Sequence, residues 1–181
     1  MGILLAFAPF IVFAVLDKYL GSTGALIAGA VISGVLIART WTKPGHPIRI
    51  LEIGTFILMM LLAIYTATAG SALSVIGVRL CADTGLLLIV LISMAVHRPF
   101  TMEYAREHVS ADLWNSPRFV RINYVLTAGW AVAFAVMVLA EIGILFIPGL
   151  PASVGIGAVG AAILGGFAFT DWYPKHVKHE G

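Results

Sequence analysis

Long apolar stretches alternate with short polar segments along the whole sequence. An apolar helix needs about 20 residues to cross the hydrocarbon core of a bilayer, so the pattern predicts six membrane-spanning helices. The first span is short, because its apolar run contains Pro9 and ends before Asp17; a signal-peptide core and a re-entrant segment are its alternatives. The predicted spans cover about residues 3–20, 20–38, 51–69, 80–96, 124–147 and 152–169.

The composition agrees with a membrane protein. Hydrophobic residues make up 60% of the chain and charged residues only 11%, and the mean hydropathy is +1.00. A water-soluble domain of 181 residues could not bury so much apolar surface. Six spans also use up the chain and leave no room for a soluble catalytic domain. We therefore expect an all-α fold, a polytopic bundle of transmembrane helices that forms a single integral membrane domain over residues 1–181.

Basic residues are distributed unevenly between the two sides that six spans define. Short cytoplasmic loops are enriched in Lys and Arg, and nine of the eleven basic residues fall in the two even-numbered loops and the C-terminal tail. Both termini are thus predicted to be cytoplasmic, which requires an even number of spans and supports counting the first. The formal net charge of +2 is too small to predict a nucleic-acid partner. The nine residues are Arg39, Lys43, Arg49, Arg98, Arg106, Arg118, Arg121, Lys175 and Lys178.

Small residues recur at every fourth position in two of the predicted spans. Small side chains let two helix backbones approach closely, so we expect neighbouring helices to pack on these stripes. Contacts within the chain are favoured, and a homo-oligomer is the alternative. The stripes are Gly21, Ala25, Gly29 and Ser33 in the second span and Gly157, Ala161 and Gly165 in the sixth.

Ionisable residues inside the spans are candidates for function, because a charge in the bilayer is costly. Glu141 lies seven residues before Pro148, or about 10 Å inside the outer boundary at 1.5 Å per residue, so it needs a partner, a proton or water. We expect Arg79 or Lys18 to approach it. The set is either a site for a proton, cation or small ligand, or a polar clamp between helices. The candidates are Glu141, Asp83, Arg79, Asp17, Lys18 and Thr127.

Glu52 lies at the beginning of the third span, three residues after Arg49. Oppositely charged residues at this spacing face each other on a helix. The sequence therefore predicts an interfacial ion pair between the two side chains.

The polar loop of residues 97–123, between the fourth and fifth spans, has an amphipathic segment. From Thr101 onward, its apolar residues follow the spacing of a helix. The pattern predicts a helix over residues 101–113 that lies on the inner membrane surface, with Thr101 as its N-cap and Trp114 as an interfacial anchor.

Motifs of known catalytic chemistry are missing from the sequence. It contains no GxSxG nucleophile, no Walker A loop and no pair of carboxylates at similar depth. Cys81 is the only cysteine, which excludes a cysteine-ligated zinc cluster, and no HExxH spacing occurs. We therefore expect a protein that is not an enzyme and has no catalytic residue, metal or cofactor.

Several short motifs resemble the bacterial intracellular septation protein A family of small inner-membrane proteins. They are FAPFIVF at residues 7–13, DKY at 17–19, the step Arg98-Pro99, and LTAGWAVAF at 126–134, in matching order along nearly the whole chain. This chain looks like a divergent relative, with Thr127 and Glu141 where we expect Asn. The resemblance implies a multi-pass protein of a bacterial inner membrane that serves cell-envelope maintenance or division through lipids and other inner-membrane proteins.

A second class of function stays open, a small transporter or channel for a proton, ion or small solute. Its polar site would lie near Glu141. A water-filled path from Glu141 toward Thr127 would favour transport, and a dry, tightly packed interior would favour a scaffold.

Overall fold

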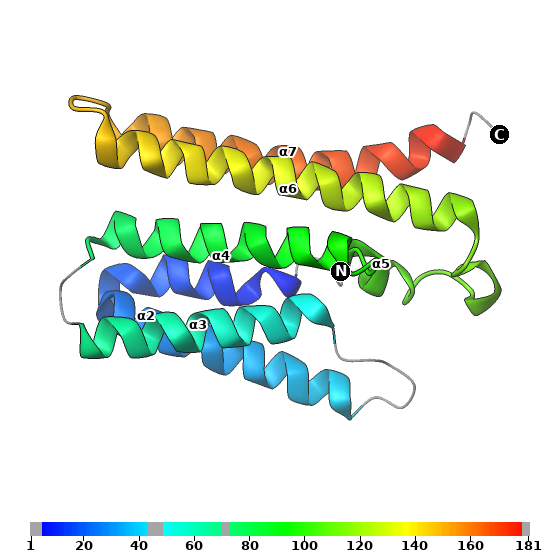
Figure 1. The fold of residues 1–181 in the computed structure, drawn as a ribbon, viewed down its shortest axis with the longest axis horizontal. Helices are drawn as coiled ribbons and strands as arrows, with labels where there is room; N and C mark the ends of the chain where they lie inside the picture. The colour runs from blue at the N-terminus through cyan, green and yellow to red at the C-terminus, as the bar shows by residue number, and fades with distance from the viewer. Residues whose placement is uncertain (1–4, 43–48, 70–72, 179–181) are drawn as a thin grey trace. The chain divides into compact units, whose positions relative to one another are not determined.

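A computed structural model describes residues 5–42, 49–69 and 73–178, and all regular secondary structure in these ranges is helical. Five of the helices are long and apolar enough to cross a membrane. These findings confirm the all-α prediction and agree with a multi-pass membrane protein. The predicted start of the first span, at residue 3, lies outside the described residues. The helices are α2 (Ala8–Trp41), α3 (Ile50–Thr68), α4 (Val75–Ala95), α5 (Phe100–Ala105), the 3-10 helix η2 (Ala111–Leu113), α6 (Pro117–Phe146) and α7 (Ala152–Lys178) (Figure 1).

The chain divides into two compact units, residues 1–89 and 90–181. The first unit contains α2, α3 and most of α4. The second contains the end of α4 together with α5, η2, α6 and α7.

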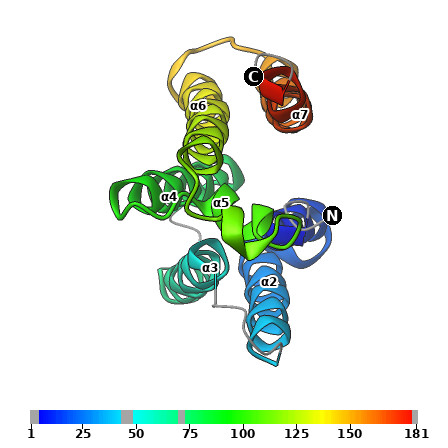
Figure 2. The same cartoon turned by 90° about the vertical axis from the view of Figure 1, so that its right-hand side faces the viewer.

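Helix α2 folds back on itself at Gly21. This residue has φ 69° and ψ 167°, a non-helical conformation inside the element. The carbonyl oxygen of Pro9 lies 3.1 Å from the place that a Cβ on Gly29 would occupy, whereas 20 residues of straight helix would separate them by about 30 Å. Figure 2 shows the two arms, dark blue and light blue, at separate positions. The arms are residues 8–20 and 22–41, so the bend falls at the predicted boundary between the first two spans.

The small residues of the stripe predicted in the second span have two different roles. Ala25, Gly29 and Ser33 are buried, and a Cβ on Gly29 would lie 3.3 Å from the Met59 sulfur of α3. These three residues form the packing face that the sequence predicts. The prediction is wrong for Gly21, which is exposed and would have nothing within 4 Å of a Cβ. Gly21 forms the bend instead, because its φ and ψ lie in a region that is open essentially to glycine alone.

Replacing Gly21 with alanine should lower the free energy of unfolding by about 1 to 3 kcal/mol, because a side chain at this φ and ψ strains the backbone. Reversible unfolding of the detergent-solubilised protein by SDS, followed by circular dichroism, measures this change. Gly34→Ala is the matched control. Gly34 lies in the second arm, where a Cβ would make an ordinary contact of 3.4 Å with Phe56. Equal stability of the two variants would contradict the account of the bend.

The core of the first unit joins α2, α3 and α4. Phe13 and Leu26 come from the two arms of α2, Met59 from α3, and Val78 and Ala82 from α4. Their exposed fractions are between 0% and 4%, so side chains from both arms contribute to one cluster. The bend at Gly21 is therefore what brings the first arm into this core.

Helix α6 begins well before the predicted span at residue 124. Its first residue is Pro117, and the Ser116 hydroxyl accepts a hydrogen bond of 3.3 Å from the backbone N–H of Phe119. Serine at the N-cap and proline at the first helical position are common start signals. The first turns, which carry Arg118 and Arg121, thus extend the helix beyond the predicted span. Helix α7 similarly continues past residue 169 to Lys178.

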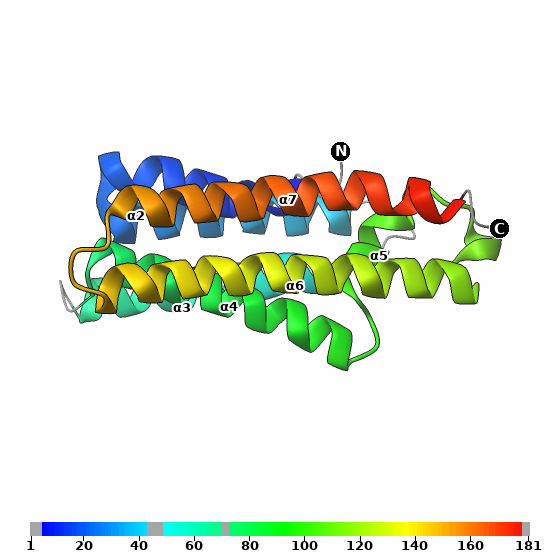
Figure 3. The same cartoon turned by 90° about the horizontal axis from the view of Figure 1, so that it is seen from above.

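Helices α6 and α7 lie side by side and antiparallel (Figure 3). Gly155 and Gly166 make this approach possible: a Cβ on Gly155 would lie 2.0 Å from Ile144, and one on Gly166 would lie 2.9 Å from the Trp130 ring. The predicted stripe on this helix does not form the contact with α6. Its residues face away because each is displaced around the helix from the buried glycines. Gly157, Ala161 and Gly165 are all exposed.

The loop before α6 does not form the predicted surface helix over residues 101–113. Helix α5 ends at Ala105, and a single 3-10 turn, η2, follows later. The predicted N-cap, Thr101, lies inside α5 and is buried, as are Met102 and Tyr104. This short helix packs against α6 and buries both polar and apolar side chains, so its amphipathic spacing does not mark a membrane surface.

Helix α4 ends in a left-handed turn at His97, whose φ is 58°. The backbone N–H of Arg98 donates to the Ser93 carbonyl at 2.9 Å, and that of His97 donates to Met94 at 3.1 Å. Paired hydrogen bonds of this kind close a helix C-terminus and turn the chain away. The turn directs the chain into α5 of the second unit.

Candidate functional site

An ion pair between Asp17 and Arg79 joins the first arm of α2 to α4. The Arg79 guanidinium donates to Oδ2 of Asp17 at 3.2 Å, and the Ser22 hydroxyl donates to Oδ1 at 2.7 Å. The Asp17 side chain is 4% exposed and that of Arg79 is 40% exposed. A buried carboxylate is thus satisfied from both sides of the Gly21 bend, by a residue in the second arm and by a residue of another helix.

The other two candidates of the first unit lie near this pair. Lys18 follows Asp17 in the chain and is exposed, since the next residue of a helix points about 100° away. Asp83 lies one turn after Arg79 on α4 and is partly buried. The structure therefore brings Asp17, Arg79 and Asp83 together at one end of the first unit. Glu141 belongs to the second unit, so its approach by Arg79 or Lys18 stays a prediction.

A second polar cluster surrounds Glu52 in the first unit. The Arg49 guanidinium donates to Oε1 at 3.1 Å, which confirms the predicted ion pair. The carboxylate is more deeply buried than an interfacial pair requires, because Glu52 is only 5% exposed. Oε2 accepts from the Thr40 hydroxyl at 3.0 Å, and the Ser33 hydroxyl donates to the Glu52 carbonyl at 2.9 Å. These two bonds connect α3 to the second arm of α2.

In the second unit, Thr127 takes part in a buried hydroxyl pair. Its Oγ1 lies 2.8 Å from Oγ1 of Thr101, and the Thr101 hydroxyl also donates to the Asn123 carbonyl at 2.9 Å. The Asn123 amide donates to the Phe119 carbonyl at 2.8 Å. Thr101, Asn123 and Thr127 are each at most 3% exposed. The candidate Thr127 therefore fastens α5 to α6.

Glu141 lies 14 residues after Thr127 on α6, or about 21 Å along the helix, and is 5% exposed. The buried residues between the two are apolar: Trp130, Phe134 and Met137 have exposed fractions of 1%, 2% and 6%. The Trp130 ring stacks on Phe134 with centroids 5.6 Å apart. The face of α6 between Thr127 and Glu141 is therefore tightly packed with large apolar side chains.

Sequence reasoning missed the hydroxyl and amide residues that complete these clusters. They carry no formal charge and do not stand out in an apolar span. Ser33 and Thr40 are seven residues apart, two turns of one helix, so both lie on the same face of α2. That spacing, together with Glu52 at the start of the following helix, could have identified Thr40 as a partner of the glutamate. The residues missed are Ser22, Thr40, Thr101 and Asn123.

All three clusters connect helices through hydrogen bonds and ion pairs. Each one joins buried polar atoms to donors or acceptors from a second segment of the chain, as buried polar groups require. Oδ1 of Asn123 and Nε of Arg79 have no hydrogen-bond partner among the described residues. Comparisons with protein-family models, curated proteins and solved structures found no match to this chain.

Proposed function

We propose that this chain is a non-enzymatic, multi-pass protein of a bacterial inner membrane that serves cell-envelope maintenance or division by binding other membrane proteins. The observation that carries this proposal is the use of the buried polar groups. The side chains of Asp17, Glu52 and Thr127 hold helices together through hydrogen bonds of 2.7 to 3.2 Å. The motifs that resemble septation protein A supply the cellular role.

The proposed topology has six spans with both termini in the cytoplasm. Its support is the reversal at Gly21, which divides α2 into two arms, together with the positions of the basic residues. Both arms of α2 then count as membrane-crossing segments, and the number of spans is even.

Transport is the second candidate function, and one observation favours it. Glu141 is a carboxylate that is 5% exposed in a helix long and apolar enough to cross a membrane. Ionisable groups at such positions serve proton and ion pathways in many membrane proteins. The apolar packing between Glu141 and Thr127 supports the scaffold instead.

Two measurements on Glu141→Gln separate these functions. This variant keeps the shape of the side chain and removes the charge. Under the proposed function, it should restore normal cell length and envelope integrity to a bacterium that lacks the gene. Liposomes containing the wild-type protein should leak protons no faster than protein-free liposomes, as followed with an internal pH-sensitive dye.

The opposite pattern would establish transport. Wild-type protein would then accelerate the proton or cation flux, and Glu141→Gln would abolish that flux while folding normally by circular dichroism. Arg39→Gln is a suitable control, because Arg39 is an exposed charge outside the candidate set whose loss should change neither measurement.

A further inference from the structure

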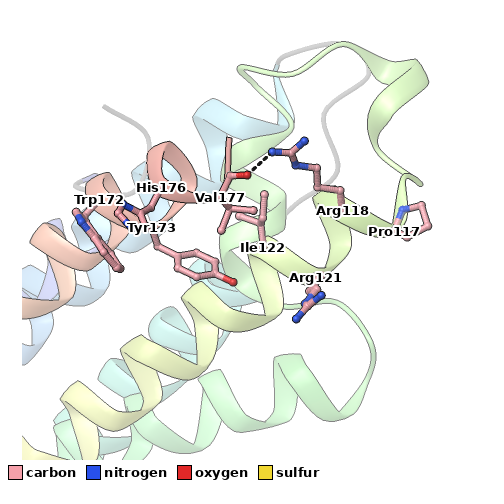
Figure 4. Close-up of a pocket in the computed structure, with 8 residues that line it drawn as sticks. All are labelled: Pro117, Arg118, Arg121, Ile122, Trp172, Tyr173, His176 and Val177. Carbon is pink, nitrogen blue, oxygen red and sulfur yellow. Dashed lines mark hydrogen bonds between the residues drawn. The ribbon is translucent and has the colours of Figure 1, made fainter. Parts of the chain in front are cut away.

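A cleft of about 570 Å³ lies between the first turns of α6 and the last turns of α7, both in the second unit (Figure 4). This volume is within the range of about 300 to 1,000 Å³ typical of small-molecule sites. The residues that line the cleft are basic, aromatic or apolar, and none is acidic. They are Pro117, Arg118, Arg121, Ile122, Trp172, Tyr173, His176 and Val177.

The two arginines differ in how they are used. The Arg118 guanidinium donates to the Val177 carbonyl at 2.6 Å and so ties the last turn of α7 to α6 (Figure 4). Arg121 lies one turn further along α6, is exposed, and forms no ion pair with the described residues. Asp171, an acid on the neighbouring part of α7, is already paired with Lys175. Arg121 is therefore the cation available to a ligand in the cleft.

Aromatic rings form the α7 wall of the cleft. The Trp172 ring stacks on His176 with centroids 4.6 Å apart, and Tyr173 stacks on Phe169 at 5.3 Å. Trp172 is 53% exposed. Trp and Tyr at the end of an apolar helix are typical of the headgroup layer of a bilayer. The cleft thus lies at the depth at which lipid headgroups are found.

We propose that this cleft binds the phosphate group of an anionic glycerophospholipid. A guanidinium matches the geometry of a phosphate and can donate two parallel hydrogen bonds to it. Basic pockets between transmembrane helices on the cytoplasmic side bind anionic headgroups in the same way. Ile122 and Val177 add apolar contacts suited to a glycerol backbone. The inference rests on the proposed membrane location and on the proposed cytoplasmic side of this end of α6 and α7, and it is independent of the proposed role in envelope maintenance.

Lipid titration of the full-length protein tests the site. Native mass spectrometry of the detergent-solubilised protein gives the apparent affinity for dioleoyl phosphatidylglycerol and for dioleoyl phosphatidylcholine. The wild type should prefer the anionic lipid. Arg121→Gln should bind phosphatidylglycerol about tenfold more weakly, the effect expected from losing one charge-assisted contact, and Arg121→Lys should lie between the two.

Arg98→Gln is the matched control, because it removes the same charge from an exposed residue of the second unit that does not line the cleft. It should reduce the affinity less than twofold. The proposal is overturned if both Gln variants bind phosphatidylglycerol equally, or if the wild type does not distinguish the two lipids. It is also overturned if inorganic phosphate in excess displaces the lipid and binds alone with the same dependence on Arg121, since the ligand is then a soluble phosphate. Circular dichroism of each variant confirms that it is folded.

Discussion

Replacing Arg79 with methionine should lower the free energy of unfolding by about 3 kcal/mol, the lower end of the range for breaking a buried ion pair. The Asp17 carboxylate is 4% exposed, and without the guanidinium one of its oxygens loses its charged partner. Arg79 is itself 40% exposed, which places the effect at the lower end. Unfolding of the purified protein by SDS measures the change.

Two further variants distinguish the ion pair from a general effect of charge. Lys18→Met removes a positive charge next to Asp17 from an exposed side chain and should change the free energy of unfolding by less than about 0.5 kcal/mol. Adding Asp17→Asn to Arg79→Met should recover part of the loss, because the buried charge is gone. Equal losses in the Arg79 and Lys18 variants would show that the pair does not stabilise the fold.

Valine at Gly166 should lower the free energy of unfolding by about 3 kcal/mol, at the upper end for overpacking. A Cβ there would lie 2.9 to 3.0 Å from three atoms of the Trp130 ring. This ring is 1% exposed and cannot easily move, since it contacts Phe167 with centroids 5.0 Å apart and donates to the Thr170 hydroxyl at 2.9 Å. SDS unfolding, combined with tryptophan fluorescence, should show both the loss of stability and the displaced ring.

The adjacent glycine is the control for this experiment. A Cβ on Gly165 has nothing within 4 Å, so Gly165→Val should be tolerated with a change below about 1 kcal/mol. The same residue type is introduced in the same turn of α7, and only the facing surface differs. A larger loss at Gly165 than at Gly166 would mean that α7 packs through the exposed stripe.

The helical architecture could be predicted from the sequence because apolar runs of span length have few other stable forms in a membrane. The helix ends were less predictable. Residues 117–123 include Arg118, Arg121 and Asn123, yet Ser116 and Pro117 begin a helix that continues into the apolar stretch. Thr101 shows the opposite case, a polar residue that is buried because its hydroxyl bonds to Asn123 and Thr127. Polarity alone does not reveal such partners.

The sequence identified which charged residues gather at the candidate site better than it identified which of them pair. The sequence placed Asp17, Arg79 and Asp83 in one polar group, but the partner of Arg79 is Asp17, 62 residues away in the chain. Spacing identifies local pairs such as Arg49 and Glu52 and gives no information on distant ones. Helix α7 likewise has two faces rich in small residues, and periodicity could not determine which of them meets α6.

If each arm of α2 crosses the membrane, as in the proposed six-span topology, the bend at Gly21 leaves the part of the first arm within α2 shorter than the hydrocarbon core. Residues 8–20 rise about 20 Å, whereas the hydrocarbon core is about 30 Å thick. Such hydrophobic mismatch is relieved when the surrounding lipid thins or when flanking side chains extend toward the headgroups. Lys18 and Tyr19, both exposed next to the bend, have side chains of the kind that extend in this way. In the proposed six-span topology, the short arm would make this end of the first unit a place where the bilayer is locally deformed, and the bilayer thickness would act on the ion pair of Asp17 and Arg79.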